Sequence, residues 1–254
     1  MKYIRLWASI LVLLLSGLAV QAQDVKSLCD KTDAALEAGN LNDARTAIET
    51  AFKTAPKDYE VLWRLARVNV LLGDANPNKN DQEASYNKAL QYAQDAVKAD
   101  GKGMNGYIRR AAASGKIALF KGVTGVADLV KSARDDASYA IQLNNATPAS
   151  LATAHYILGR THLRLTETPK IIRMPIGLGW GNIGEAVSNL KRSVELRNGF
   201  IMFHLDYARA LVKEENWQEA KKQLYAIPAM KNQEVGDDAR KQEAAQLVEQ
   251  IKNK

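Results

Sequence analysis

Small side chains recur at fixed intervals along this chain, and they constrain its fold more than any other feature of the sequence. Five segments share a small residue that is followed, four and seven positions later, by another small or apolar residue. The first of these positions are Ala44, Ala89, Ala133, Ala186 and Ala220. The later ones are Ile48, Ala93, Ala137, Leu190 and Leu224, then Ala51, Ala96, Ala140, Ser193 and Ile227. This spacing places one narrow stripe of close-packing residues on each of five predicted helices.

A partner helix precedes each of these five helices. Four partners have a small residue at their own crossing point, namely Ala66, Ala111, Gly159 and Ala208, and residues 24–38 give a weaker version. A bulky side chain at such a crossing would overpack it at a cost of about 1–3 kcal/mol. Helix pairs of this kind resemble the tetratricopeptide repeat of about 34 residues. The pattern predicts an all-α fold, a right-handed α-solenoid of about five degenerate helix pairs across residues 23–254.

The units differ in length, because their first small residues lie 45, 44, 53 and 34 positions apart. The three middle units therefore carry insertions between their two helices. Residues 74–82 are polar and predict a loop, with Asp81 as the cap of the next helix. Residues 122–132 have apolar residues at helical spacing, which predicts a backward extension of the second helix. Gly39 and Gly73 are expected to end the first two partner helices.

The third insertion, residues 166–184, combines apolar side chains with helix breakers. It contains Ile171, Ile172, Met174 and Trp180 among several glycines and prolines. Such a loop must bury its apolar side chains against something. Three interpretations are open: a plug or lid that folds into the groove, a contact with a membrane surface, or a contact with a protein partner.

The last segment, residues 236–253, has the pattern of a capping helix. Ala244, Leu247, Val248 and Ile251 share one face, and charged residues occupy the other. A terminal helix with an apolar inner face and a charged outer face closes the core of a repeat array.

The start of the chain has the pattern of a cleaved export signal. Lys2 and Arg5 precede an apolar run of 15 residues from Leu6 to Val20, which is shorter than the roughly 20 residues of a membrane span. Small residues at Val20 and Ala22 predict cleavage after Ala22, with an uncleaved anchor as the alternative. Residues 1–22 are therefore interpreted as a signal peptide, and the protein as periplasmic or otherwise extracytoplasmic.

Several short motifs resemble the regulator of microtubule dynamics family. They are Ala118–Gly122, His155–Arg160, the insertion before Glu185–Ala186, and Glu243–Leu247, and the resemblance extends over about residues 60–250. It implies an all-helical, non-enzymatic array, and some eukaryotic members are associated with microtubules and organelle membranes. An export signal does not fit an association with microtubules. We therefore expect this chain to share the fold of the family and its role as a binding module, but not the microtubule partner.

The concave face of such an array is lined by the first helix of each unit. The positions after the crossing residues place basic side chains there, and Arg160 with Arg164, and Arg209 with Lys213, share one face each. Arginine binds carboxylates in a bidentate way, so we expect a protein or peptide partner with acidic or C-terminal carboxylate groups. An internally paired basic face is the alternative. The predicted groove residues are Trp63, Arg67, Lys116, Tyr156, Arg160, Arg164, Arg209 and Lys213.

Other functions have less support in the sequence. A lipid or small apolar ligand carrier, with a cavity covered by residues 166–184, is the alternative to a peptide scaffold. No catalytic motif is present, so no enzymatic activity and no cofactor are expected. Three histidines and one cysteine, Cys29, provide no metal-like spacing. After cleavage the net charge of +7 falls to +5, because the signal holds two basic residues, and this modest value disfavours nucleic acid. The oligomeric state is open.

Overall fold

The computed structural model describes residues 22–121 and 125–254, and the regular structure within them is helical. The proposed signal peptide therefore lies outside the described residues except for Ala22. A helix over residues 22–37 comes first. The following helices are α2 Leu41–Thr54, α3 Tyr59–Ala75, α4 Lys79–Ala99, α5 Met104–Lys121, α6 Ala127–Leu143, α7 Pro148–Thr166, α8 Lys170–Arg173, α9 Ile183–Leu196, α10 Ile201–Lys213, α11 Trp217–Ala226, the 3-10 helix η1 Ile227–Ala229 and α12 Asp237–Ile251.

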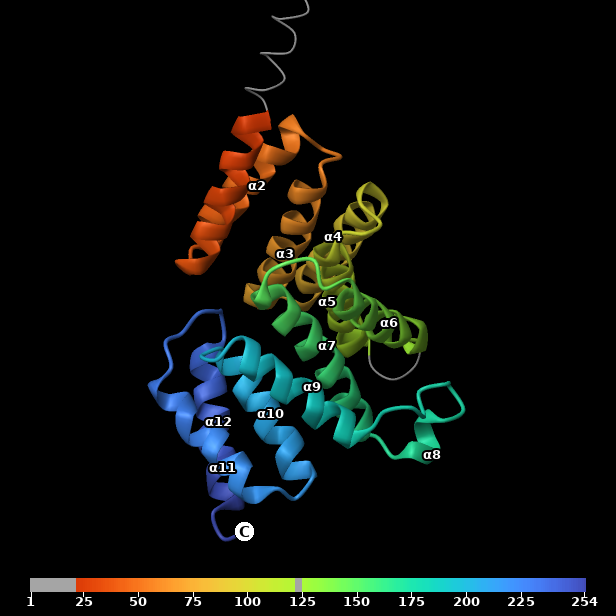
Figure 1. Ribbon diagram of the computed structural model, residues 1–254, viewed down its shortest axis with the longest axis vertical. Coiled ribbons are helices and arrows are strands. Elements are labelled where there is room, and N and C mark those ends of the chain that lie inside the picture. The colour runs from red at the N-terminus through yellow and green to blue at the C-terminus, as the bar shows by residue number, and fades with distance from the viewer. Residues whose placement is uncertain (1–21, 122–124) are drawn as a thin grey trace, which may run out of the picture.

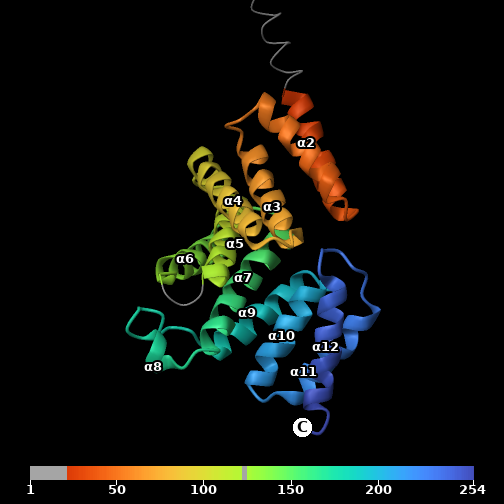
Figure 2. The same ribbon diagram turned by 180° about the vertical axis from the view of Figure 1, so that it is seen from behind.

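Consecutive helices pair and stack into a superhelix (Figure 1). The pairs are helix 22–37 with α2, α3 with α4, α5 with α6, α7 with α9, and α10 with α11. The last helix, α12, packs on α10 and α11 as a cap. Both Figure 1 and Figure 2 show α8 standing away from the stacked pairs. The predicted all-α solenoid of about five pairs with a capping helix is confirmed.

The small residues lie where the sequence pattern requires them, at the helix crossings. All five first-position alanines are buried, as are their partners four and seven positions later. Gly159 of α7 marks a close approach of two helices, because a Cβ atom there would lie 2.8 Å from Leu190 Cγ and 2.9 Å from the Leu190 backbone nitrogen. Side chains at this point would push α7 and α9 apart.

Polar caps set the starts of six described helices. The side chains of these residues accept hydrogen bonds from backbone N–H groups in the first turn, which stabilises a helix by about 1 kcal/mol each. They are Asn40, Asp58, Asn78, Thr147, Asn182 and Asn216.

Two details differ from the sequence prediction. The cap of α4 is Asn78 and not Asp81, because most of the first insertion lengthens α3 and α4 and only residues 76–78 form the connection. Gly73 does not end α3. It lies inside the helix, where a Cβ atom would be 2.4 Å from the ring of Tyr86, so its role is a close contact with α4. Gly39, with a φ of +74°, does follow the first helix as expected.

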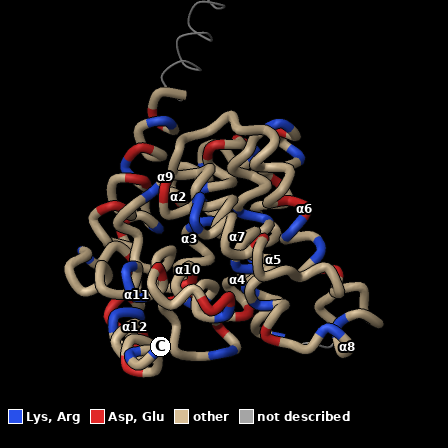
Figure 3. Tube along the Cα trace, turned by 60° about the horizontal axis from the view of Figure 1, so that its bottom comes forward, with Lys and Arg blue, Asp and Glu red and all other residues tan. Residues whose placement is uncertain are grey.

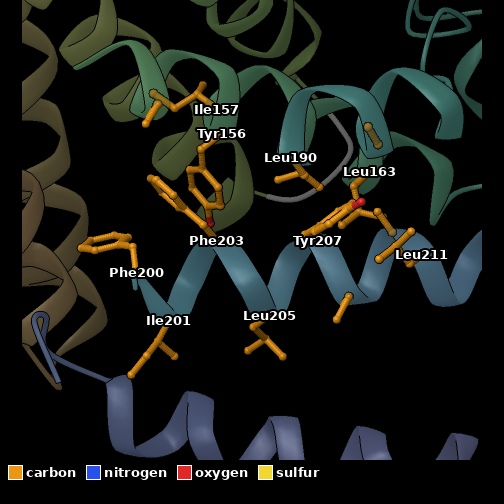
Figure 4. Packing of buried hydrophobic residues seen from close by; sticks show 14 of the residues in the cluster. Tyr156, Ile157, Leu163, Leu190, Phe200, Ile201, Phe203, Leu205, Tyr207 and Leu211 are labelled. Atoms are coloured by element: carbon orange, nitrogen blue, oxygen red, sulfur yellow. The ribbon is translucent and has the colours of Figure 1, made fainter. Parts of the chain in front are cut away.

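The largest apolar cluster lies in the second half of the array. Figure 4 shows Tyr156 of α7 beside Phe203 of α10, with Ile201 and Leu205 on the opposite side of α10. The rings of Tyr156 and Phe203 stack with their centres 4.7 Å apart. A separate cluster joins helix 22–37 to α2 and α3. Each pair thus buries its apolar face against the next pair, as in other repeat arrays.

The crossing of α7 and α9 yields a stability prediction. Gly159→Ala should lower the free energy of unfolding by about 1–3 kcal/mol, because overpacking outweighs the better helix propensity of alanine. Gly115→Ala in α5 is the matched control, since no heavy atom lies within 4 Å of a Cβ atom there. The control should raise the free energy of unfolding by about 0.4–1 kcal/mol. Urea denaturation followed by circular dichroism measures both, and equal stabilisation by the two changes would contradict the close approach.

Candidate functional site

A cavity of about 1030 Å³ lies along the inner side of the superhelix. Its walls come from α3, α5, α7 and the start of α10. Asp33 and Glu37 of the first helix border it on one side, and Glu234 of the connection before α12 borders it on the other. The first and last units therefore face each other across one shared space. This volume is at the upper end of typical ligand pockets, so it has room for a short peptide segment.

The structure brings six of the eight predicted groove residues to this cavity. Those that line it are Trp63, Arg67, Lys116, Tyr156, Arg160 and Arg164. Arg209 and Lys213 are not part of its lining. Arg209 instead bonds to Glu243 of α12, so it connects the fifth unit to the cap.

Asp206 of α10 neutralises two of the predicted basic groups. Its carboxylate accepts hydrogen bonds from Arg160 at 2.8 Å, from Arg209 at 2.6 Å and from the hydroxyl of Tyr156 at 2.7 Å. Burial by itself would raise the pKa of this carboxyl, but the attraction of the two arginines outweighs that effect and lowers the pKa. Removing one member of a buried charge network of this kind is strongly destabilising. Arg160 and Arg209 therefore have a structural role.

Other basic side chains on the inner face are also paired. Lys116 donates to Asp74 of α3 at 2.6 Å, Arg164 donates to Glu167 at 3.1 Å, and Arg67 lies 3.7 Å from Asp33. Figure 3 shows basic and acidic residues interspersed along the trace. The expected continuous basic stripe is thus largely compensated by carboxylates within the chain.

Four basic residues that the sequence analysis did not predict line the cavity, Arg64, Arg109, Arg173 and Arg197, and Arg109 of α5 differs from the other three in its surroundings. It lines the cavity, and its Nε is buried without a hydrogen-bond partner. Burial, followed by repulsion from Arg67, lowers the pKa of Arg109 to about 9. The sequence contained one indication of this residue, the adjacent pair Arg109-Arg110. Helical spacing alone could not show which of the two faces the cavity: Arg110 bonds to Asp136, and Arg109 lines the cavity.

Aromatic rings accompany the basic groups. The guanidinium of Arg64 lies 4.1 Å from the ring centre of Trp63, and that of Arg109 lies 5.7 Å from the same ring. Across the cavity, Arg197 lies 4.0 Å from the ring centre of Phe200. Rings of this kind attract cations at their faces and offer apolar contact to a ligand. The lining therefore combines cations with large apolar surfaces.

The insertion at residues 166–184 does not fill the cavity. Ile171 is 81% exposed, and Ile172 and Met174 are also exposed. The loop is closed by the buried Arg173, which donates to the carbonyl oxygens of Thr168, Leu178 and Gly181. The interpretation as a groove plug or lid is wrong, because α8 directs its apolar side chains outward. Only Thr168, Arg173 and Leu178 from this segment border the cavity.

Trp180 has a different position from the other apolar residues of the insertion. Its ring contacts His162 edge-on with ring centres 5.1 Å apart, and the guanidinium of Arg134 lies 4.5 Å from its centre. Trp180 thus fastens the end of the insertion to α7 and α6.

The histidines and the cysteine have local partners or are buried. His155 bonds to Asn189, His204 bonds to Gln223 and Asn198, and His162 accepts from the backbone of Asn182. Burial raises the pKa of Cys29 to about 11, which disfavours a thiolate. In the described part of the chain, no three His, Cys, Asp or Glu side chains are placed to hold a metal ion. Among the described helices, none has the length and apolar character for a membrane crossing.

Comparisons with known proteins agree with this architecture. No curated protein matches the chain by sequence. The structure of TTC0263, a thermophilic TPR protein of Thermus thermophilus, is similar with a TM-score of 0.62 and 18% identity over 87% of this chain and 98% of that one. The structure of PilF of Pseudomonas aeruginosa has a TM-score of 0.55 and 14% identity over 91% of this chain and 93% of that one.

A match to a protein-family model identifies the family of this chain, whereas the similar structures show only its fold. The family model described as "Regulator of microtubule dynamics protein 1-3" matches residues 28–252, which run from within the first helix to the end of the capping helix α12. The chain therefore belongs to the regulator of microtubule dynamics protein 1-3 family.

Proposed function

We propose that this chain is an exported, non-enzymatic scaffold that binds a protein or peptide segment in the cavity of its superhelix. The observation that carries the proposal is the cavity itself, about 1030 Å³ in volume and bordered by both ends of the array. A segment bound there would contact several units at once. Stacked units hold their inner helices at fixed positions, which reduces the ordering cost of binding.

The energetics require both charged and apolar contacts. A hydrogen bond to a charged group contributes about 1.5–3 kcal/mol, whereas a micromolar complex needs about 8 kcal/mol. Apolar lining residues such as Trp63, Phe200 and Met202 supply the additional surface. Since most basic groups already have internal partners, apolar burial would provide a large share of the affinity.

A lipid or small apolar ligand carrier has less support. Such a carrier needs a closed apolar chamber, and the insertion does not cover this one. Polar side chains also border the cavity, among them Asn105, Thr153 and Thr161. Amide and hydroxyl groups can pair with the backbone of a peptide, whereas a hydrocarbon chain leaves them without partners.

Filling the cavity tests the proposal. Gly115 lines the cavity with open space around it, so Gly115→Phe should fold normally and obstruct the site. An immobilised array of random ten-residue peptides, probed with fluorescently labelled protein, should retain the native chain. Binding should fall at least tenfold for Gly115→Phe, about 1.4 kcal/mol, and should persist for the small control Gly115→Ala. Equal binding by all three proteins would show that peptides bind elsewhere.

Export is the second part of the proposal, and it is supported by the basic start, the apolar run of 15 residues and the small residues before Gln23. Intact mass measurement of the protein purified from its native envelope fraction tests it. The expected mature chain begins at Gln23, and a chain that retains Met1 would contradict cleavage.

The α8 tip, defined by Ile171, Ile172, Met174 and Ile176, supports a further candidate role, contact with a membrane surface. These four side chains are exposed on one protruding loop, and the exposed Lys170 begins the same turn. The amine of Lys131 also approaches the loop at Gly177. Apolar side chains next to basic groups suit the interface of an anionic bilayer.

Vesicle binding tests this role. The native protein should sediment with vesicles of phosphatidylglycerol and phosphatidylcholine, and the double change Ile171→Ser, Ile172→Ser should lower the partition coefficient at least tenfold, since each buried isoleucine contributes about 1.5–3 kcal/mol. Tyr225→Ser is the matched control, because Tyr225 is exposed on α11, away from the tip. Sedimentation that does not depend on the two isoleucines would exclude the tip as the membrane contact.

A further inference from the structure

The cavity extends along the axis of α5, which packs between α3 and α7. All three helices border it over nearly their whole length. The bordering residues run from Tyr59 to Asp74 in α3, from Met104 to Leu119 in α5 and from Ala149 to Leu165 in α7. At 1.5 Å per residue, the cavity follows α5 for about 22 Å, the length of about four helical turns. A helical segment of this length therefore has room to lie along α5.

Small side chains predominate in the second half of α5. The α5 floor, defined by Ala111, Ala112, Gly115, Ala118 and Leu119, borders the cavity, and Leu119 is 52% exposed. At the crossings within helix pairs, small residues are covered by a partner helix. At Gly115, in contrast, no heavy atom lies within 4 Å of a Cβ atom. Within the described chain, the α5 floor thus resembles a helix crossing that lacks its partner helix.

The sides of the cavity next to the α5 floor are apolar. The ion pair of Lys116 with Asp74 places the end of α3 beside this half of α5, and Val70 and Leu71 of α3 line the cavity. Leu165 adds apolar lining from α7. An occupant needs apolar side chains here, because a polar group would be buried without a hydrogen-bond partner.

The polar side chains around the α5 floor already have partners within the chain. Lys116 donates to both carboxylate oxygens of Asp74, at 2.6 and 2.7 Å. Thr153 and Thr161 each donate the hydroxyl hydrogen to a carbonyl oxygen one turn earlier in α7, so they can accept a hydrogen bond from a ligand but not donate one. An extended segment presents one N–H and one C=O group per residue. A helix pairs these groups internally except at its two ends, so a helical occupant fits this surface better.

Arg109 provides an independent indication of a ligand. It lies on α5 before the α5 floor, it lines the cavity, and its Nε is buried with no acceptor among the described residues. Arg164, on the far half of α7, has Glu167 as an ionic partner at 3.1 Å. The last turn of a helix carries carbonyl oxygens without intrahelical partners and a partial negative charge. The C-terminal end of a helix therefore suits the position of Arg109.

We propose that the occupant of the cavity is an amphipathic helix of a partner protein that lies along α5, with its apolar face on Gly115 and Leu119 and its C-terminal end at Arg109. The helix takes the place of the missing partner at the α5 floor. Its carbonyl oxygens provide the acceptor that Arg109 lacks. This inference rests on the proposed function for the cavity, and it adds the conformation and the direction of the bound segment.

The test compares two peptide pools of the same composition. Each contains fourteen-residue peptides, about 21 Å long as helices, with six apolar residues among Gln, Glu and Lys. In the helical pool the apolar residues recur at the spacing of one helix face, and in the alternating pool they occupy every second position, which gives an apolar face only to an extended chain. Both pools have acetylated N-termini and amidated C-termini. Isothermal titration should show the helical pool binding at least tenfold more tightly.

A variant of the α5 floor locates the contact. Leu119→Ser should lower the affinity for the helical pool about tenfold, because it removes one buried apolar side chain from the interface. Tyr225→Ser is the matched control and should change nothing, since Tyr225 is also an exposed apolar side chain but is not part of the cavity lining. A preference for the helical pool that survives Leu119→Ser unchanged would overturn the placement along α5.

A second variant tests the direction of the helix. Arg109→Met should lower the affinity for the helical pool about threefold to tenfold, because it removes the donor groups at the helix end. The melting temperature should not fall, since Arg109 has no ion pair within the described chain that would be lost. Arg192→Met is the matched control, because Arg192 is an exposed arginine that is paired with Glu195. Equal affinity for the native protein and Arg109→Met would overturn the assigned direction.

The outcomes separate this inference from the proposed function. Equal binding of the two pools, or tighter binding of the alternating pool, with both blocked by Gly115→Phe, would overturn the helix and leave the peptide cavity standing. If neither pool bound while the random peptides of the array did, the helix would again be overturned and the cavity would stand. If no peptide of any kind bound, the proposed function itself would be overturned.

Discussion

The close approach of paired helices is the constraint on which the rest of this structure depends. At Gly159 there is no space for a β-carbon between α7 and Leu190 of α9, and buried alanines play the same part at the other crossings. Because each pair is packed so tightly, its inner helix has little freedom to rotate or shift. The side chains on α3, α5, α7 and α10 therefore have defined positions relative to one another, and the cavity between them has a defined shape.

Features of this structure could be predicted from the sequence where the interacting residues are close together along the chain, and could not where they are far apart. The helix pairs were predictable because the spacing of Ala133, Ala137 and Ala140 is a local pattern, read within two turns of one helix. The partners of the basic residues were not, because Asp206 reaches Arg160 across 46 residues of chain and two helices. Sequence alone therefore could not separate a binding arginine from a structural one. The orientation of α8 also depends on tertiary contacts, above all on the carbonyl oxygens that surround Arg173.

Charge compensation explains why few of the basic groups are available to a ligand. Asp206 is almost completely buried between Arg160 and Arg209, and its removal from water requires both of them. Lys116 has a similar relation to Asp74. These pairs connect α7 with α10 and α3 with α5, so they contribute to the register of neighbouring units. The basic side chains that remain available to a ligand are those without a carboxylate partner in the chain. The lack of an internal partner is therefore a stricter criterion for a binding residue than positive charge alone.

The position of the cavity between the two ends of the array has a mechanical consequence. In a solenoid, each repeat unit contacts mainly its neighbours. The curvature of the array is therefore the sum of small rotations between successive units, and small changes at each interface can alter it. Asp33 and Glu37 belong to the first coil, whereas Phe200 and Glu234 belong to the last ones, and all four border the same space. An occupant that contacted both sides would hold the two ends of the array at one separation and would thereby fix its curvature. A change of curvature on binding would then alter the spacing of helices on the outer, convex surface, even if no single helix pair changed internally.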